Sequence, residues 1–491
     1  MPWLRRFFCI AVSVAKFAAT AADFYVSPRG DDTNPGTLAQ PWRTVQKAAD
    51  SLAPGETAWI RGGVYRELVT IRVSGTAPDQ WITFRAYEGE KPILDGRRVP
   101  LPADSEVALL LIRDCRYVRV QGLELRNFSS RTADVVPCGI FVTGTSEHLQ
   151  ILGNRIHHIA TTAKDGNALG LAVYGTANTP IRQLVIDGNE IHHCKLGSSE
   201  SLVLNGNITE FEVTNNRVHD NNNIGIDFIG FEGTCADPTQ DRPRDGVCRD
   251  NTVRNIKSFG NPAYGRVYAA GGIYVDGGTR ILVERNVVHH CDIGVELASE
   301  HAGRSTSEIT LRENLIYLNR VGGIFLGGYD ELRGATESCF IHHNTLYQND
   351  TRRSGNGELC LQHFVLNNAI THNIFFAGKQ RLLIGNLPPH TGNTFDYNLY
   401  FAPKGGAPEW EWMSTRYSGF DEYRSATGAD AHGLFADPLF TRASAADFQL
   451  TPMSPAVDAG DPAFAAAPNE TDLEGAPRIN GVRVDLGADE F

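Results

Sequence analysis

The sequence has little methionine and no long apolar run beyond its N-terminus. Only 3 of the 491 residues are methionine, and no later stretch reaches the ~18 consecutive apolar residues of a membrane-spanning helix. Basic residues are outnumbered, 45 against 57 acidic ones, giving a formal net charge of −12 at pH 7. Nucleic-acid binding needs a basic surface that displaces counterions from phosphates. The composition therefore argues against a membrane span and nucleic-acid partners, and favours a glycan or small-molecule substrate.

The 9 cysteines show no C-x-x-C spacing of the zinc-binding kind. Cys235 and Cys248 bracket a polar insertion and are the best disulfide candidates in an oxidising compartment. The alternative, that both are free thiols, stays open because connectivity is not readable from sequence.

The first 22 residues predict a signal peptide. Arg5 and Arg6 precede an apolar stretch over residues 7–15, and the small residues 19–21 resemble a cleavage site. We therefore expect a secreted or periplasmic protein.

Residues 24–67 predict a strand, a loop rich in Gly, Pro and Asp, a short amphipathic helix from Trp42 to Leu52, and a second strand closed by Gly62 and Gly63. This segment resembles the N-terminal cap of many secreted right-handed parallel β-helix proteins, in which the helix covers the first open edge. A cap is needed because an uncovered solenoid end exposes unpaired strand groups and apolar core.

From Trp81 onward, short apolar strands such as GIFVTG, GIDFIG, GIYVDG and GVELAS recur. Asparagines follow them in a single column at intervals of roughly thirty residues, as coil repeats require. The column contains Asn154, Asn189, Asn216, Asn251, Asn286, Asn314, Asn344 and Asn373. We expect these side chains to form a hydrogen-bonded ladder that closes a buried turn.

The repeat predicts an all-β fold, a right-handed parallel β-helix (solenoid) with an N-terminal capping helix. We expect a signal peptide at 1–22, the cap at 23–80, the β-helix at 81–400 and a C-terminal cap or tail at 401–491. The DPLF, SPAVDAGD and TDLEGAPR motifs of the tail resemble the C-terminal region of many secreted bacterial β-helix proteins, which packs on the last coils.

Histidine pairs recur beside the asparagine column, at residues 157–158, 192–193, 289–290 and 342–343. Repetition at one turn position favours stacked scaffold residues over metal ligands.

Alternate residues of a strand face outward, so the third and fifth positions of each Gly-Ile-x-Val-x-Gly unit should line a solvent-filled groove. Three carboxylates, those of Asp227, Asp276 and Glu296, fall at these positions in consecutive units. Rungs lie ~4.8 Å apart, which places the backbones of Asp276 and Glu296 roughly 8 Å apart. Paired carboxylates at such distances are typical of glycoside hydrolysis.

The cap segments GVYRELVTIRVSGT and ITFRAYEGEKPILDG, with the motifs GIYVDGGTR and GVELASEHAG, are similar to β-xylosidases built on a right-handed β-helix. The resemblance implies that Asp276 is the nucleophile and Glu296 the acid/base residue, with His301 following the glutamate as a histidine does in that family. Gly277 stands where the family has an aromatic residue after the aspartate, so the sugar specificity does not carry over. The likeness covers the cap and these two motifs, and elsewhere only the fold is shared.

Long insertions gather around the same units, and insertions on a regular coil commonly form the walls of a binding cleft. We expect Tyr264 and Arg266 of one insertion, with Tyr274 and Asn205 of the strands and His301, to bind substrate. Asp227 is expected to bind substrate or to act as a third catalytic group.

Two other functions compete with hydrolysis. In a calcium-dependent polysaccharide lyase of the pectate or alginate lyase kind, Asp227, Asp276 and Glu296 would bind the cation and Lys195, Lys257 or Arg266 would act as the base. A hydrolase needs no cofactor. The third possibility is a non-catalytic glycan-binding surface protein. No lysine or arginine falls on the predicted groove positions beside these acids, which disfavours the lyase.

Overall fold

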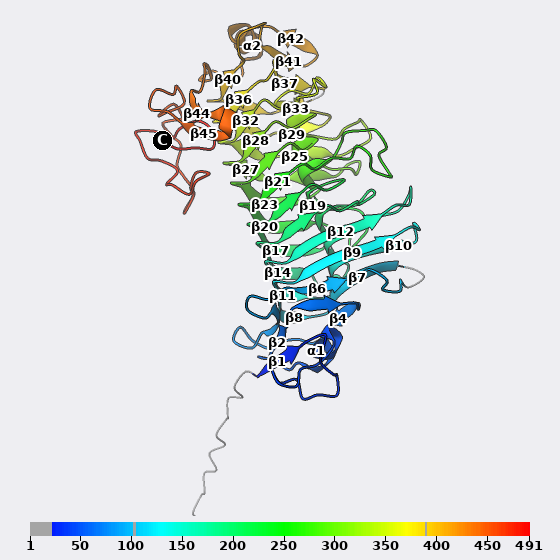
Figure 1. Ribbon diagram of the computed structural model, residues 1–491. Coiled ribbons are helices and arrows are strands. Elements are labelled where there is room, and N and C mark those ends of the chain that lie inside the picture. The colour runs from blue at the N-terminus through cyan, green and yellow to red at the C-terminus, as the bar shows by residue number, and fades with distance from the viewer. Residues whose placement is uncertain (1–21, 102–104, 388–389) are drawn as a thin grey trace, which may run out of the picture.

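The computed structural model describes residues 22–101, 105–387 and 390–491 and confirms the predicted right-handed parallel β-helix (Figure 1). The signal peptide expected at residues 1–22 lies outside this range except for Ala22. Among the described residues, no helix is long and apolar enough to cross a membrane.

Three sheets run the length of the coil, parallel except for the final β41–β42 hairpin (residues 409–417), and in the later turns the sheet-2 segment is split into two short strands. Sheet 1 contains β4 (Val69–Ile71), β7 (Ser105–Arg113), β10 (Val135–Thr143), β13 (Leu169–Gly175), β16 (Leu202–Gly206), β19 (Ile226–Ile229), β22 (Gly271–Asp276), β25 (Ile293–Ala298), β29 (Gly322–Leu326), β33 (Leu359–Leu361), β37 (Leu382–Asn386), β41 (Glu409–Trp412) and β42 (Thr415–Tyr417).

Sheet 2 contains β1 (Asp23–Val26), β2 (Thr57–Ile60), β5 (Ile82–Ala86), β8 (Arg116–Gln121), β11 (Glu147–Leu152), β14 (Ile181–Asp187), β17 (Ile208–Thr214), β20 (Pro243–Arg249), β23 (Thr279–Glu284), β26 (Ser305–Ser307), β27 (Thr310–Arg312), β30 (Ala335–Glu337), β31 (Phe340–His342), β34 (Val365–Leu366), β35 (Ala369–Thr371), β38 (His390–Thr391) and β39 (Thr394–Asp396).

Sheet 3 contains β3 (Gly63–Tyr65), β6 (Pro92–Asp95), β9 (Glu124–Ser130), β12 (Arg155–Thr161), β15 (Glu190–His192), β18 (Arg217–His219), β21 (Thr252–Arg254), β24 (Val287–His289), β28 (Leu315–Tyr317), β32 (Thr345–Tyr347), β36 (Ile374–Phe376), β40 (Leu399–Phe401) and β43 (Leu434–Phe435).

The core fills the space between the sheets with alternate residues of every strand. On β22, for example, Ile273 and Val275 are fully buried in the main apolar cluster, while Tyr274 faces the other side of the sheet. This period-two pattern is the one that the sequence predicted.

The asparagine column forms the expected ladder between sheets 2 and 3. From Asn154 to Asn373, each backbone N–H donates to the side-chain oxygen of the next asparagine at 2.9–3.1 Å. The ladder continues one step beyond the prediction, to Asn398, whose side chain donates to Asp430 at 2.8 Å. Each amide thus bridges neighbouring coils inside the molecule.

Replacing Asn251 with Ala is expected to lower the free energy of unfolding by about 3 kcal/mol, because it leaves buried groups on two neighbouring coils without partners. The Asn251 side chain accepts from the backbone of Asn216 and donates to the Val213 carbonyl and to Asn286. Urea unfolding followed by circular dichroism measures the change. The exposed Asn480→Ala is the control, with an expected loss of under ~0.5 kcal/mol; equal losses would contradict the ladder's role.

Helices close both ends of the coil. Helix α1 (Val45–Ser51) begins after Thr44, whose hydroxyl accepts from the Lys47 N–H. It covers the first edge as expected: the Gln46 side chain donates to the Thr70 carbonyl at 3.1 Å and accepts from the Thr70 N–H at 2.7 Å. At the other end, α2 (Phe420–Thr427) stacks Tyr423 on the buried Trp410 of β41, with ring centroids 5.5 Å apart.

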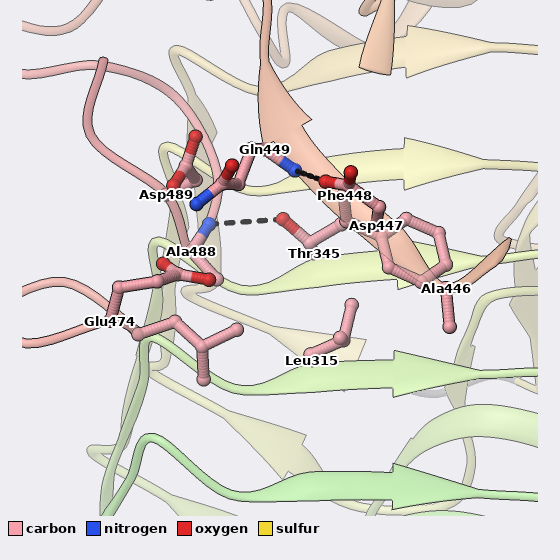
Figure 2. Close-up of a pocket in the computed structure, with 10 residues that line it drawn as sticks. Leu315, Thr345, Ala446, Asp447, Phe448, Gln449, Glu474, Ala488 and Asp489 are labelled. Carbon is pink, nitrogen blue, oxygen red and sulfur yellow. Dashed lines mark hydrogen bonds between the residues drawn. The ribbon is translucent and has the colours of Figure 1, made fainter. Parts of the chain in front are cut away.

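The tail after β43 folds back onto the later strands of sheet 3 (Figure 1). Its hairpin, β44 (Phe440–Arg442) and β45 (Asp447–Leu450) around the 3-10 turn Ala443–Ala445, places Phe448 against Tyr317 and Tyr347. The Ala488 N–H donates to the Thr345 hydroxyl at 3.0 Å, beside a cavity of about 320 Å³ (Figure 2). Segments more than one hundred residues apart in sequence are therefore in contact here.

Two expectations about side chains need correction. Cys235 and Cys248 are both free and buried: Cys248 points into the apolar core, and Cys235 lies by the Ala177 carbonyl. The histidines stack as expected on β12 and β15, where the rings of His157 and His192 lie 4.7 Å apart. The pair His342–His343, however, precedes its ladder residue Asn344 and so belongs to a different turn.

Candidate functional site

Asp227, Tyr274 and Glu296 form one row across three neighbouring strands of sheet 1. Asp227 of β19 pairs with Tyr274 of β22, which in turn pairs with Glu296 of β25. Asp276 lies two residues further along β22, opposite Ala298. The inward neighbours of these residues belong to the core, so the row projects from the outer face. The register matches the one that the sequence predicted.

The outer face is not the open, solvated groove that was expected. Asp227, Asp276 and Glu296 are only 1%, 4% and 7% exposed. Side chains of the loops after β19, β21 and β25 lie close enough to interact electrostatically with them. On earlier coils, the outward residues Phe141 and Ala172 join a second buried apolar cluster. The carboxylates therefore sit at the bottom of a covered site.

Three further carboxylates, which the sequence reasoning missed, surround the row. They belong to Glu200 before β16, Glu232 after β19 and Glu300 after β25. The Glu300 backbone N–H donates to Asp276 Oδ1 at 2.8 Å, and the negative charge of Glu300 raises the pKa of both Asp276 and Glu296. Glu200 is buried, whereas Glu232 is exposed and marks the side on which the site meets solvent.

Burial and mutual repulsion hold these carboxyls toward their protonated forms. Burial, reinforced by the charge of Glu300, raises the pKa of Glu296 to about 8. Burial is also the main reason that the pKa of Asp276 is well above its usual value, with Glu300 as the next cause. For Asp227, burial and then the charge of Glu200 raise the pKa strongly. Such shifts are typical of groups that exchange protons at functional sites.

The site also holds buried polar atoms without partners among the described residues. Asp227 Oδ1 and His301 Nε2 are buried and accept or donate no hydrogen bond there. Burial raises the pKa of Glu300, and the nearby positive charge of Arg333, whose guanidinium donates to the Glu300 carbonyl at 3.1 Å, lowers it in part.

Four of the five expected substrate-binding residues lie at the cluster. Tyr274 is in the row itself. Burial raises the pKa of the half-buried Tyr264 to about 12, and the negative charges of Glu300 and Glu200 contribute to this increase. The remaining two are Asn205, which donates to Glu232 at 3.1 Å and accepts from Thr234 at 2.6 Å, and His301, which directly follows Glu300 in the chain.

The fifth residue, Arg266, is exposed on its loop. Of the bases expected for a lyase, Lys257 is likewise exposed, and half-buried Lys195 lies in the turn that bridges Ala160 and Asn222.

A cavity lies over the preceding coils of sheet 1. Its volume is about 460 Å³, within the range of ligand pockets in general. It is lined by the outward residues Phe141, Thr143 and Tyr174 and by Thr234, which is bonded to Asn205.

Two groups of side chains in the described chain place their ligand atoms close enough for a single metal ion, and both lie where the tail meets the coil. They are Glu313, His342, His343 and Glu470, and Asp472, Glu474 and Asp489. The second group borders the cavity of Figure 2.

Comparisons with known proteins agree with the fold. Residues 138–407 match the family described as "Right handed beta helix region", and residues 24–182 match "Pel9A-like, right handed beta helix region". The chain is 43% identical over 433 residues to the uncharacterized protein YwoF of Bacillus subtilis (strain 168), covering 88% of this chain and 91% of that protein.

Two other similarities are partial. Over 210 residues, 38% of this chain and 47% of the relative, the chain is 32% identical to pectate lyase PEL9 of Emericella nidulans. The structure of the GH136 lacto-N-biosidase from Eubacterium ramulus superposes with a TM-score of 0.51 at 15% identity, over 78% of this chain and 64% of that one, which shows a shared fold.

Proposed function

The chain belongs to the family of proteins with a right-handed β-helix region, and from this premise we propose that it cleaves glycosidic bonds of a polysaccharide or oligosaccharide as a glycoside hydrolase. The observation that carries the proposal is the placement of Asp276 and Glu296 on adjacent strands in one covered site. Two carboxylates on either side of a scissile bond are the groups that this reaction uses.

The environments of the two carboxyls suggest different roles. Glu296, with a pKa of about 8, carries a proton at neutral pH and can donate it to the leaving oxygen. Asp276 is oriented by the backbone N–H of Glu300 and would act on the anomeric carbon, directly or through water, once it has lost its proton. Asp227, with its unpartnered oxygen, is proposed to bind a sugar hydroxyl.

The activity should fall as pH rises through about 8, because the proposed acid Glu296 then loses its proton. Below that pH the acid is mostly protonated, so the alkaline limb of the kcat/KM profile, which reflects the free enzyme, reports this group. Initial rates between pH 5 and 10 on one substrate measure it. An alkaline limb that stays in place in Glu300→Gln would contradict the link, since removing that negative charge should shift it to lower pH.

Calcium-dependent polysaccharide elimination is the second candidate, and the likeness to pectate lyase PEL9 favours it. Asp227, Asp276 and Glu296 would then supply oxygen ligands to the cation. The Pel9A-like match, however, ends at residue 182, before any of these carboxylates. The geometry of the site therefore weighs more heavily in favour of hydrolysis.

One screen separates the candidates. The protein is incubated with nitrophenyl glycosides and cell-wall polysaccharides, with and without calcium. Reducing ends without an unsaturated product support hydrolysis, while calcium-dependent ultraviolet absorbance of an unsaturated sugar supports the lyase. Binding without any cleavage would identify a non-catalytic glycan-binding protein. We also propose that the protein is exported, and N-terminal sequencing of protein from the culture medium or periplasm tests this.

A further inference from the structure

A cluster of metal-ligating side chains lies far from the carboxylates of sheet 1. The side chains of Glu313, His342, His343 and Glu470 each offer one ligand atom, and these atoms all lie within 4.8 Å of one another. Glu313 follows β27, and His343 follows β31. These two strands pair with each other, and Arg312 lies opposite His342 in the pairing. Glu313 and His343 are therefore neighbours at the same turn position of adjacent coils, and Glu470 reaches them from the tail.

The tail changes the environment of this turn position. On earlier coils the position is held by Gly153, Gly188, Asn215 and Asp250, which are exposed, and by Arg285, which is half-buried. Where the tail covers the coil, Glu313 and His343 are 0% exposed and Glu470 is 6% exposed. Ionisable groups thus stand at positions that a small or apolar residue could have filled.

Several atoms of the cluster have no hydrogen-bond partner among the described residues. Arg312 contacts one oxygen of each carboxylate, with Nη1 at 2.8 Å from Glu470 Oε2 and Nε at 3.1 Å from Glu313 Oε2. The other oxygens, Oε1 of Glu313 and of Glu470, and Nε2 of His343 remain buried and unpartnered. Three such atoms in one cluster are unusual because buried polar groups are almost always paired.

The nearby arginines leave these atoms without a partner because each arginine is shared with other groups. Arg312 also binds a third carboxylate, that of Glu284, at 2.8 Å. Half-buried Arg285 pairs with the same Glu284 at 3.1 Å. Arg478 is buried, lies 3.6 Å from Glu490 and donates to two backbone carbonyls. The unpartnered atoms therefore remain available to a cation.

We propose that Glu313, His342, His343 and Glu470 bind one divalent transition-metal ion of the zinc class, which fastens the tail to the coil. Two imidazoles and two carboxylates are a ligand set that such ions accept, whereas calcium prefers oxygen ligands alone. Protein side chains would occupy all four coordination positions of the ion and leave none for water or substrate, so the ion would have a structural role.

The test uses the full chain, stripped with a chelator and titrated with zinc chloride. Calorimetry and elemental analysis should give one zinc per chain, and cobalt in its place should give the visible bands of a nitrogen- and oxygen-ligated site. Glu470→Gln should weaken binding at least ~10-fold, since even outer-shell partners contribute this much. Zinc should raise the Tm of the wild type more than that of the variant, and chelation should expose the tail to protease.

The matched control is His289→Gln, which alters a histidine pair that has the same Nδ1 contact, 2.8 Å, but no member in the cluster. It should bind zinc as the wild type does. If Glu470→Gln does not fold, the partly exposed His342→Gln replaces it. Absence of stoichiometric zinc in the wild type, or loss of binding in His289→Gln with retention in the cluster variant, would overturn the proposal.

Discussion

Replacing Glu296 with Gln is expected to lower kcat/KM by about 10²- to 10⁴-fold, the usual contribution of a general acid. The amide has nearly the same shape but cannot give a proton to the leaving oxygen. The loss should be largest on natural glycans, whose leaving groups need protonation, and smaller on nitrophenyl glycosides, whose leaving groups depart as stable anions. Initial rates on both kinds of substrate measure this difference.

The matched control is Glu358→Gln. Glu358 is also fully buried, and burial also raises its pKa to about 8, but its carboxylate accepts hydrogen bonds from the side chains of Asn349 and Gln380. The control should change stability and leave the activity per folded molecule intact. An equal loss of kcat/KM in both variants, or an equal loss on both kinds of substrate, would show that Glu296 is not the general acid.

The sequence predicted the coil and its register because both depend on short-range periodicity. Residues two apart face the same side of a strand, and units recur at a nearly constant interval, so Asp227 and Glu296 could be assigned to one row from spacing alone. The asparagine ladder followed from the same repeat, and its members bond as expected.

Features that depend on loops and on the tail could not be predicted in this way. Glu200, Glu232 and Glu300 stand outside the strands, where no period fixes the direction of a side chain. The row is also buried, which turns an expected solvated groove into a covered site with raised pKa values. The position of each acid at a strand end, next to a long insertion, was the available signal.

The misplaced histidine pair has a similar explanation. His342 and His343 look like the other pairs in sequence, but they precede their ladder residue, Asn344. Their surroundings are set by Glu470, more than one hundred residues away, and only the folded tail brings it there.

Replacing Asp276 with Asn is expected to lower kcat/KM by about 10³-fold, because the amide can neither attack the anomeric carbon nor activate water. The first-formed anomer of the wild-type product, observed by NMR, distinguishes these two roles. Asp245→Asn is the control, since this carboxylate pairs with Arg280 on the exposed surface. Comparable losses in the two variants would indicate that Asp276 has no special part in the reaction.

The same variant should be more stable than the wild type at alkaline pH. The pKa of Asp276 is raised in the folded state, so the folded chain holds this proton more tightly than the unfolded chain, and stability declines as pH rises from the unfolded value of about 3.9. Asparagine carries no charge, so its advantage in Tm should be largest near pH 9 and shrink toward pH 4. If the variant is inactive but more stable, the charge of Asp276 lowers stability and is needed for catalysis. If the variant is inactive and less stable, Asp276 is a structural residue.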